Sequence, residues 1–326
     1  MERELINSLR ELLSEEQVKE EEPLMRYTTF RIGGPAELLV TVYTPAQLEM
    51  AVRLLKAAGH EPVIIGNGSN LLVSDDGVRG AVVRFAATCG DEPEILYEDE
   101  QTVTVRVSGG AMLSGFAKEM TNRGFTGLEF AAGIPGSVGG AVFMNAGAYG
   151  GEIKDVITSA VILDRKGNRR TVEAGELELS YRHSALTDNG AMVLSAAFTL
   201  NRGDAEEGRA KIAELLKKRK EKQPLEYPSA GSTFKRPEGY FAGKLIEDAG
   251  LSGYSVGGAR VSEKHCGFVI NGGNATALDV LRLITEVRKR VYAMSSVWLT
   301  PEVRFLGDFS RLPEDADREL VKPAGA

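Results

Sequence analysis

The chain has 326 residues, which is more than one typical hydrophobic core contains, so two or three packed units are expected. A net charge of −7 gives no signature of a nucleic-acid-binding protein. Three histidines and two cysteines, Cys89 and Cys266, argue against a multi-histidine metal site, a zinc ribbon, an iron–sulfur cluster or a disulfide framework, whereas 37 glycines predict turns and ligand-contacting loops.

The first predicted element is an amphipathic helix over residues 1–22, because leucines recur at helical spacing up to Leu13 and Pro23 would end it. A strand at 36–43 precedes a helix that Thr44 caps, that Pro45 opens and that runs to about Ala58. Short strands are expected at 62–65, 71–73 and 81–85. Residues 23–86 therefore form the first predicted unit.

Residues 87–202 form a second unit that favours strands, at 95–97, 102–107, 156–164 and 192–200, with a helix at about 112–123. Asp204 would then cap a helix that runs to about Gln223. The stretch from Arg209 to Lys222 within it contains seven basic and two acidic residues. The third unit, 203–299, also contains predicted helices at 241–249 and 277–294. Residues 300–326 hold a last strand and a polar tail from 314 onward.

Two glycine-rich segments are candidates for ligand binding. Gly66-Asn67-Gly68-Ser69-Asn70 follows a predicted strand, and the backbone N–H groups of small residues can hold an anion such as pyrophosphate. The alternative is a tight turn between strands.

The second segment runs from Gly133 to Gly150, with a glycine at every third position from Gly133 to Gly139. It is neither a Walker A loop nor a Rossmann fingerprint. A short helix is expected to begin at Gly136-Ser137, so that Ser137 and the N–H groups after it could meet a phosphate. Two such segments favour a large dinucleotide, and close-packed helix–strand crossings are the alternative.

Three polar side chains are candidates for catalysis. Arg182 could polarise a carboxylate, or it could be a surface ion-pair residue. Ser232 could donate a proton or cap a turn, and no Gly-x-Ser-x-Gly motif or Ser/His/Asp set indicates a hydrolase. Glu302, at the start of a strand with apolar neighbours, could have a raised pKa, or it could pair with Arg304.

Taken in order, five motifs resemble the UDP-N-acetylenolpyruvoylglucosamine reductases, the MurB family of flavoenzymes. The resemblance extends from about Arg26 to Gly307, and it rests on the segments 66–72, 133–140, 181–184, 230–235 and 301–304. No tyrosine occurs between Arg182 and Tyr227, so the chain resembles the shorter subclass, which lacks a tyrosine-bearing insertion. The resemblance implies an α+β fold with a two-part FAD-binding domain of the vanillyl-alcohol-oxidase (PCMH) type and a smaller α/β substrate-binding domain.

The family implies noncovalent FAD, NADPH as co-substrate and a UDP-sugar substrate in peptidoglycan precursor synthesis. In this reading 23–86 and 87–202 are the two FAD-binding subdomains, 203–299 binds substrate, and the strand after 300 returns to the active site. The implied catalytic residues are Arg182, Ser232 and Glu302. The implied cofactor-binding residues are Gly66, Asn67, Gly68, Ser69, Asn70, Gly133, Pro135, Gly136, Ser137, Gly139 and Gly140. The implied substrate-binding residues are Tyr181, Arg219, Lys222 and Lys235, with His265 as a further candidate.

Other parts of the sequence narrow these expectations. Lys217, Lys218 and Lys220 are expected to be solvated rather than ligand-binding. The segment 1–22 lacks the basic start and apolar run of a signal peptide, and no stretch approaches 18 apolar residues. We therefore expect a cytoplasmic protein with no membrane insertion and no nucleic-acid partner. The sequence carries no signal for an oligomeric state.

Two alternatives stay open at this point. One is another FAD-dependent oxidase or dehydrogenase of the same superfamily, although no histidine or cysteine for covalent flavin attachment occurs between Pro62 and Phe85. The other is a noncatalytic protein that binds a nucleotide sugar or a flavin, against which the set of Arg182, Ser232 and Glu302 argues.

Overall fold

The computed structural model describes residues 1–86, 92–310 and 318–321, which form two compact units. Unit 1 comprises Met1–Lys19, Leu39–Asn67 and Ala81–Arg219, and unit 2 comprises Glu20–Leu38, Gly68–Gly80 and Lys220–Ala326. Each unit is therefore assembled from segments far apart in the sequence. Cys89 and most of the tail expected from residue 314 lie outside the described residues.

The N-terminal helix α1 is shorter than the sequence predicted. It spans Arg3–Leu12 and buries Leu5, Ile6 and Leu9, and the chain then enters strand β1 at Val18–Pro23. The prediction of a helix to residue 22 was wrong because the leucine spacing ends at Leu13, and Val18 is buried instead as the first residue of a strand.

One sheet has four strands in the order β1-β2-β5-β3. Strand β2 spans Pro35–Val42, β5 spans Val78–Phe85, and β3, at Val63–Ile65, runs parallel to β5. Helix α2, Pro45–Ala57, has Pro45 at its first position, and the Thr44 side chain accepts a hydrogen bond from the Gln47 N–H. These elements confirm the predicted strand–helix–strand pattern of this part of the chain.

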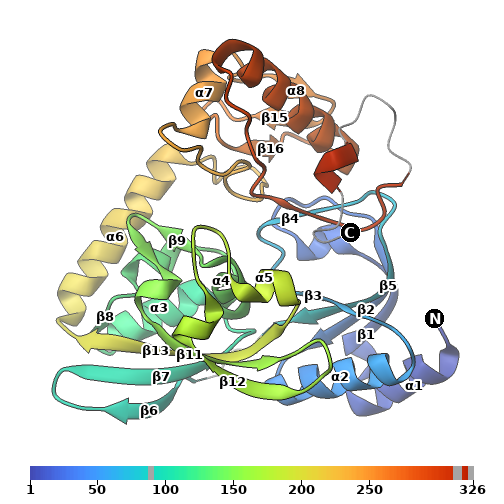
Figure 1. The fold of residues 1–326 in the computed structure, drawn as a ribbon, viewed down its shortest axis with the longest axis vertical. Helices are drawn as coiled ribbons and strands as arrows, with labels where there is room; N and C mark the ends of the chain where they lie inside the picture. Colours follow the sequence, from blue (N-terminus) through green and yellow to red (C-terminus); the bar gives the residue numbers. More distant parts are fainter. Residues whose placement is uncertain (87–91, 311–317, 322–326) are drawn as a thin grey trace. The chain divides into compact units, whose positions relative to one another are not determined.

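The largest sheet lies in unit 1 and is antiparallel, in the order β12-β11-β13-β7-β6, with β8 paired to β13. Its strands are β6 (Glu94–Glu98), β7 (Thr102–Ser108), β8 (Phe125–Thr126), β11 (Ile157–Leu163), β12 (Arg169–Glu173) and β13 (Met192–Arg202). Figure 1 shows helices α3 (Leu113–Asn122) and α4 (Val138–Met144) along one face of this sheet. Alternate residues of β7 and β13 form the core of unit 1 with these helices.

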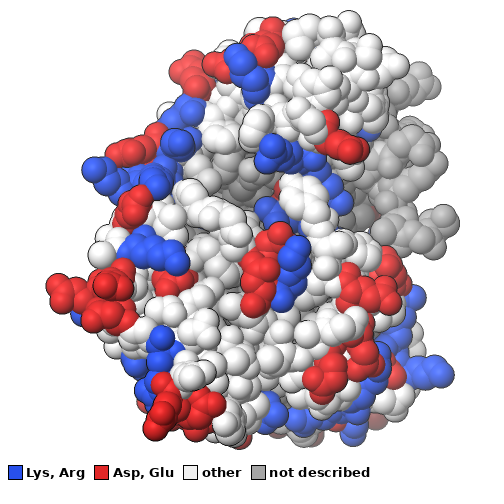
Figure 2. Space-filling model, turned by 60° about the vertical axis from the view of Figure 1, so that its left-hand side comes forward, with Lys and Arg blue, Asp and Glu red and all other residues white. Residues whose placement is uncertain are grey.

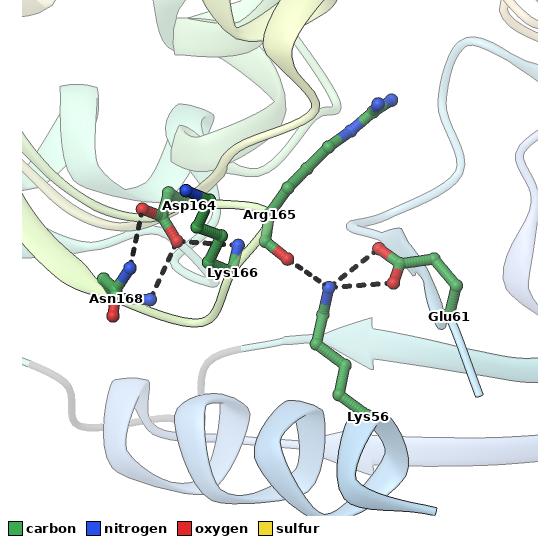
Figure 3. A network of polar contacts seen from close by, with 6 residues as sticks. All are labelled: Lys56, Glu61, Asp164, Arg165, Lys166 and Asn168. Atoms are coloured by element: carbon green, nitrogen blue, oxygen red, sulfur yellow. Dashed lines mark hydrogen bonds and ion pairs between the residues drawn. The ribbon is translucent and has the colours of Figure 1, made fainter. Parts of the chain in front are cut away.

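A lysine joins two elements of unit 1 that are distant in sequence. Lys56, in the last turn of α2, donates hydrogen bonds to both carboxylate oxygens of Glu61, at 2.9 and 2.8 Å, and to the backbone oxygen of Arg165 (Figure 3). Arg165 lies in the β11–β12 turn, which Asp164 closes by accepting hydrogen bonds from the N–H groups of Lys166 and Asn168 (Figure 3).

Unit 2 contains a three-stranded antiparallel sheet of β14 (Ser255–Val256), β15 (Ala259–Val261) and β16 (Val269–Asn271). It also contains helices α7 (Ala242–Asp248) and α8 (Ala277–Ser295), and its core is built mainly from α7, α8 and this sheet. Strand β4 (Leu71–Val73) pairs in parallel with β17 (Arg304–Leu306). The Asp75 carboxylate accepts hydrogen bonds from the Ala277 and Leu278 N–H groups, at 2.8 and 3.2 Å, and so covers the first turn of α8.

The helices and sheets of the two units confirm the predicted α+β class. Elements that the sequence did not predict include the short helix α5 (Ala185–Asn189), the strand pair β9 (Gly147–Ala148) and β10 (Gly151–Glu152), and strands β1, β8, β12, β14, β15 and β16. Over the described ranges, no helix is long and apolar enough to cross a membrane, and no group of three or more His, Cys, Asp or Glu side chains is arranged to hold a metal ion.

Candidate active site

The first glycine motif lies against the second within unit 1. A Cβ atom on Gly66 would lie 2.2 Å from Ser137 Oγ and 3.2 Å from Ser137 Cβ. The Asn67 side-chain amide donates a hydrogen bond to the Pro135 carbonyl oxygen at 3.2 Å. The structure therefore brings the start of the first candidate segment into contact with the middle of the second.

Helix α4 begins in the second segment, as predicted, and Ser137 caps it. The Ser137 side chain accepts a hydrogen bond from the Gly140 N–H at 3.3 Å. The Val138 N–H donates to the Ala111 carbonyl at 2.8 Å, and the Gly139 N–H donates to the Gly109 carbonyl at 2.7 Å. These amides have acceptors within the chain, and the expectation that they meet a phosphate stays a prediction.

The second segment also crosses another part of the backbone closely. A Cβ atom on Gly139 would lie 3.0 Å from the Gly109 oxygen, so a side chain here would press on the Gly109 backbone. The alternative reading of the second segment, a close-packed crossing, explains Gly139. Ser137, which is buried, and Pro135 are the residues of this segment that contact the first motif.

The remainder of the first motif belongs to unit 2. Gly68 has φ +60°, its carbonyl accepts a hydrogen bond from the Thr29 N–H at 3.3 Å, and a Cβ atom on it would lie 2.2 Å from the Tyr27 oxygen. At Gly68 the tight-turn reading therefore accounts for the glycine. Ser69 is half-buried, and Asn70 leads directly into β4.

Arg182 lies in unit 1 at the tip of a tight turn closed by Ser180 and His183. Its φ of 55° is in the left-handed region, and its Nη2 donates a hydrogen bond to the Gly147 carbonyl at 3.2 Å. The guanidinium also lies 5.1 Å from the ring centroid of Tyr181, within the range of a cation–π contact. The Tyr181 side chain is exposed.

Ser232 and Glu302 both lie in unit 2, on segments that hydrogen bonds hold together. The Glu302 N–H donates to the Thr233 carbonyl at 2.8 Å, and the Lys235 N–H donates to the Thr300 carbonyl at 2.8 Å. Ser232 is exposed, whereas Thr233, beside it, is buried and accepts a hydrogen bond from the Val269 N–H at 2.9 Å. Strand β17 begins at Arg304, so Glu302 stands just before the strand that it was expected to open.

The basic helix α6 spans Ala205–Lys222, and the Asp204 side chain accepts hydrogen bonds from the Glu206 and Glu207 N–H groups, which confirms the predicted cap. Lys217, Lys218 and Lys220 are exposed, as predicted, and so is Lys222. Figure 2 shows basic and acidic side chains interspersed over the face displayed.

Arg219 differs from its neighbours on α6 because its side chain turns back onto the second glycine segment. Its Nη1 donates a hydrogen bond to the Gly133 carbonyl, and burial lowers the pKa of the guanidinium from its ordinary value. About two turns earlier, Lys211 Nζ lies 3.2 Å from Glu129 Oε2. Glu129 opens the short helix η3 (Glu129–Gly133), so α6 is attached to both ends of η3.

Two further candidates have mainly structural contacts. Lys235 is half-buried, and its backbone belongs to the pairing beside Glu302. His265 Nδ1 accepts a hydrogen bond from the Gly267 N–H at 3.1 Å, and its ring packs edge-on against Phe268 with the centroids 4.9 Å apart. Burial lowers the pKa of His265.

The sequence reasoning missed Asn145, which is fully buried and supports the Arg182 turn. Its side-chain amide donates to the Ser180 carbonyl at 2.9 Å and to Glu152 Oε2 at 2.6 Å, and its oxygen accepts from the Lys154 N–H at 3.0 Å. Asn145 has φ 43° at the end of α4. An asparagine just past a glycine-rich helix was the available signal, since this residue type tolerates a left-handed conformation.

The fold and these residues define a class, the flavoenzymes that bind FAD in a domain of mixed helices and strands. Residues 36–173 match a family model described as an FAD binding domain. Residues 223–306 match a second model, described as the C-terminal domain of UDP-N-acetylenolpyruvoylglucosamine reductase.

Relatives that match most of the chain belong to one family within that class. The chain is 51% identical over 306 residues to UDP-N-acetylenolpyruvoylglucosamine reductase of Lachnoclostridium phytofermentans, which covers 93% of this chain and 97% of the relative. The corresponding protein of Clostridioides difficile is 45% identical over 301 residues, covering 92% and 97%. The crystal structure of the Thermus caldophilus reductase aligns with a TM-score of 0.72 at 36% identity, covering 87% of this chain and 97% of that one. The chain belongs to the UDP-N-acetylenolpyruvoylglucosamine reductase family.

Proposed function

We propose that this chain reduces UDP-N-acetylenolpyruvoylglucosamine to UDP-N-acetylmuramate with NADPH and bound FAD, and that Arg182, Ser232 and Glu302 are its catalytic residues. The observation that carries the assignment is the backbone pairing in unit 2, where the Glu302 N–H donates to the carbonyl of Thr233, the residue next to Ser232. It places an acid and a hydroxyl, which are far apart in sequence, on adjoining segments.

Several residues of unit 1 fit FAD. Gly66 lets Ser137 Oγ approach its backbone closely, and the Asn67 amide donates a hydrogen bond to the Pro135 carbonyl, so small and polar groups of the two motifs lie together. Small residues and side-chain amides of this kind let a nucleotide approach the backbone and meet polar donors. We assign Gly66, Asn67, Pro135, Gly136 and Ser137 to FAD binding first. Five more residues of the two motifs are assigned to the same surface on family grounds: Gly68, Ser69, Gly133, Gly139 and Gly140.

The catalytic roles follow from the charge that the reaction develops. FAD held by these residues and reduced by NADPH would supply the hydride that adds to the methylene carbon of the enolpyruvyl group. Negative charge then develops on the carbon beside the carboxylate, where preorganised cations and acids stabilise it best. Arg182 and Glu302 would stabilise that charge, and the Ser232 hydroxyl would deliver a proton to the same carbon, which completes the addition of a hydride and a proton across the double bond.

The substrate supplies a diphosphate and a carboxylate, both of which require cations. Lys222 and Lys235 offer ammonium groups, and Tyr181 presents an exposed ring beside Arg182. Arg219 is assigned to the substrate on family grounds, although its guanidinium bonds to the Gly133 carbonyl and therefore also supports the second glycine segment. We further propose the subdivision 23–86 and 87–202 for FAD, 203–299 for substrate and 300–326 for the C-terminal segment, with the enzyme in the cytoplasm.

The test is a comparison of flavin content and turnover. The purified protein should show a flavin visible spectrum and should oxidise NADPH faster when UDP-N-acetylenolpyruvoylglucosamine is added. Ser232→Ala should keep the flavin colour and its reduction by NADPH but lose reoxidation by the substrate. Ser252→Ala, an exposed serine of the same unit, is the matched control and should behave as the wild type.

Two outcomes would contradict the proposal. A protein that binds no FAD would remove the flavin reaction altogether. A flavoprotein that NADPH reduces but that this substrate does not reoxidise would favour the alternative, another FAD-dependent oxidase or dehydrogenase of the same superfamily.

A further inference from the structure

Asn70 makes two contacts with the segment that carries Glu302. Its side-chain Nδ2 donates a hydrogen bond to the Glu302 carbonyl oxygen at 3.0 Å, and its own carbonyl accepts one from the Arg304 N–H at 2.9 Å. From the next residue onward, β4 and β17 pair in parallel, with Leu71 opposite Arg304. The side chain of Asn70 therefore extends this pairing back to Glu302, beyond the end of the strands.

The backbone of Glu302 is consequently held from both sides. Its N–H donates to the Thr233 carbonyl at 2.8 Å, and its carbonyl accepts from Asn70. Val303, the next residue, is buried. When the N–H and carbonyl of a residue are bonded and the next side chain is buried, its backbone has little freedom to rotate, so the side chain of Glu302 starts from a defined Cβ position.

We propose that Asn70 is a positioning residue for Glu302. The sequence placed Asn70 among the cofactor-binding residues, but its amide donates to the segment of the proposed acid. This inference rests on the proposed catalytic role of Glu302. It links the end of the first glycine motif to the step in which the substrate is reduced, and not to the retention of FAD.

Asparagine supplies what the contact needs, an amide N–H₂ donor on a short side chain. Asn70→Asp keeps the size and shape, but it replaces that donor with an oxygen that faces the Glu302 carbonyl oxygen. The backbone bond from the Arg304 N–H and the β4–β17 pairing do not involve the side chain, so the variant should still fold. Asn201→Asp, at an exposed position of β13, makes the same chemical change elsewhere and is the control.

The experiment measures three quantities on the FAD-loaded enzyme: bound FAD per chain, the rate of flavin reduction by NADPH, and the rate of reoxidation by UDP-N-acetylenolpyruvoylglucosamine under anaerobic conditions. For Asn70→Asp we expect unchanged FAD content and a reduction rate within about twofold of wild type, with reoxidation slowed about 10- to 100-fold by loss of positioning. Asn201→Asp should match the wild type in all three.

A double-mutant cycle with Glu302→Gln then tests whether Asn70 acts through Glu302. If it does, adding Asn70→Asp to Glu302→Gln should slow reoxidation by less than about threefold, because the group that it positions is already disabled. The inference would be overturned if the two substitutions slowed reoxidation by factors that multiply in the double variant, or if Asn70→Asp lost FAD. Either result would leave the proposed role of Glu302 intact. A Glu302→Gln enzyme that reoxidises normally would overturn the proposed function and this inference with it.

Discussion

Glu129 and Lys211 form an ion pair, and substituting Lys211 should lower the free energy of unfolding more than substituting Glu129. The Glu129 side chain is 3% exposed and the Lys211 side chain is 59% exposed. Oε2 of Glu129 accepts hydrogen bonds from Lys211 Nζ at 3.2 Å and from the Gly127 N–H at 3.1 Å. The carboxylate is therefore the group that burial penalises, while the ammonium remains largely in water.

Lys211→Met removes one of these two donors and leaves a buried carboxylate behind. Losing one partner of a fully buried pair costs about 3–5 kcal/mol, and the solvent around Lys211 reduces this to about 1–3 kcal/mol. Glu129→Gln removes the buried charge, keeps an acceptor for the Gly127 N–H and leaves Lys211 solvated, so it should cost about 1 kcal/mol or less. The double variant should therefore be more stable than Lys211→Met alone.

The assay is urea unfolding of the FAD-loaded enzyme at one fixed concentration of free FAD, because bound ligand adds to the apparent stability. Lys217→Met, an exposed lysine on the same helix, is the control and should stay within about 0.5 kcal/mol of wild type. The reasoning would be refuted if Glu129→Gln cost more than Lys211→Met, or if the double variant were no more stable than Lys211→Met.

Three further changes test other contacts in the same unfolding assay. Gly66→Ala should cost about 1–2 kcal/mol, because Ser137 Oγ must move away and uncap α4, and this cost should largely disappear in a Ser137→Gly background. Asn145→Ala should cost about 2–3 kcal/mol by leaving buried polar groups unpaired, and Asn145→Gly, which relieves the left-handed backbone, should recover only part of it. Burial lowers the pKa of His265 in the folded chain below its ordinary 6.5. The unfolded chain therefore binds the proton at a higher pH than the folded chain does. The free energy of unfolding that His265 contributes above pH 6.5 is then lost as the pH falls through the lower folded pKa. His265→Gln should lose less stability over that window, and equal losses would contradict the argument.

The sequence predicted local elements well where one physical signal decided them. The helix opened by Thr44 and Pro45 and the cap of α6 by Asp204 were confirmed because a capping side chain stands directly before each helix. The N-terminal helix was overextended because acidic residues after Leu13 carry no periodic signal in either direction, and pairing in a sheet decided their conformation. Pairing with a distant strand is a tertiary effect that a local pattern does not contain.

The glycine motifs show a second limit of sequence reasoning. A glycine can be required because a ligand approaches the backbone or because another part of the chain does, and both leave the same residue in the sequence. At Gly139 the neighbour is the Gly109 carbonyl, and at Gly68 it is the Tyr27 carbonyl. At Gly66 the neighbour is the Ser137 side chain, which joins the two candidate segments.

The residues that support the proposed catalytic side chains share one property, which explains why the sequence did not assign them this role. Asn145 donates to the Ser180 carbonyl in the turn that carries Arg182, and Asn70 donates to the carbonyl of Glu302 itself. In both cases a side-chain amide holds a backbone carbonyl of a segment distant in sequence. Every residue has a backbone carbonyl, so the residue type at the supported position does not indicate that its carbonyl accepts a side-chain hydrogen bond. Substituting these asparagines should therefore move a catalytic side chain without altering its chemistry, and the half-reaction that uses that side chain should fail while the other continues.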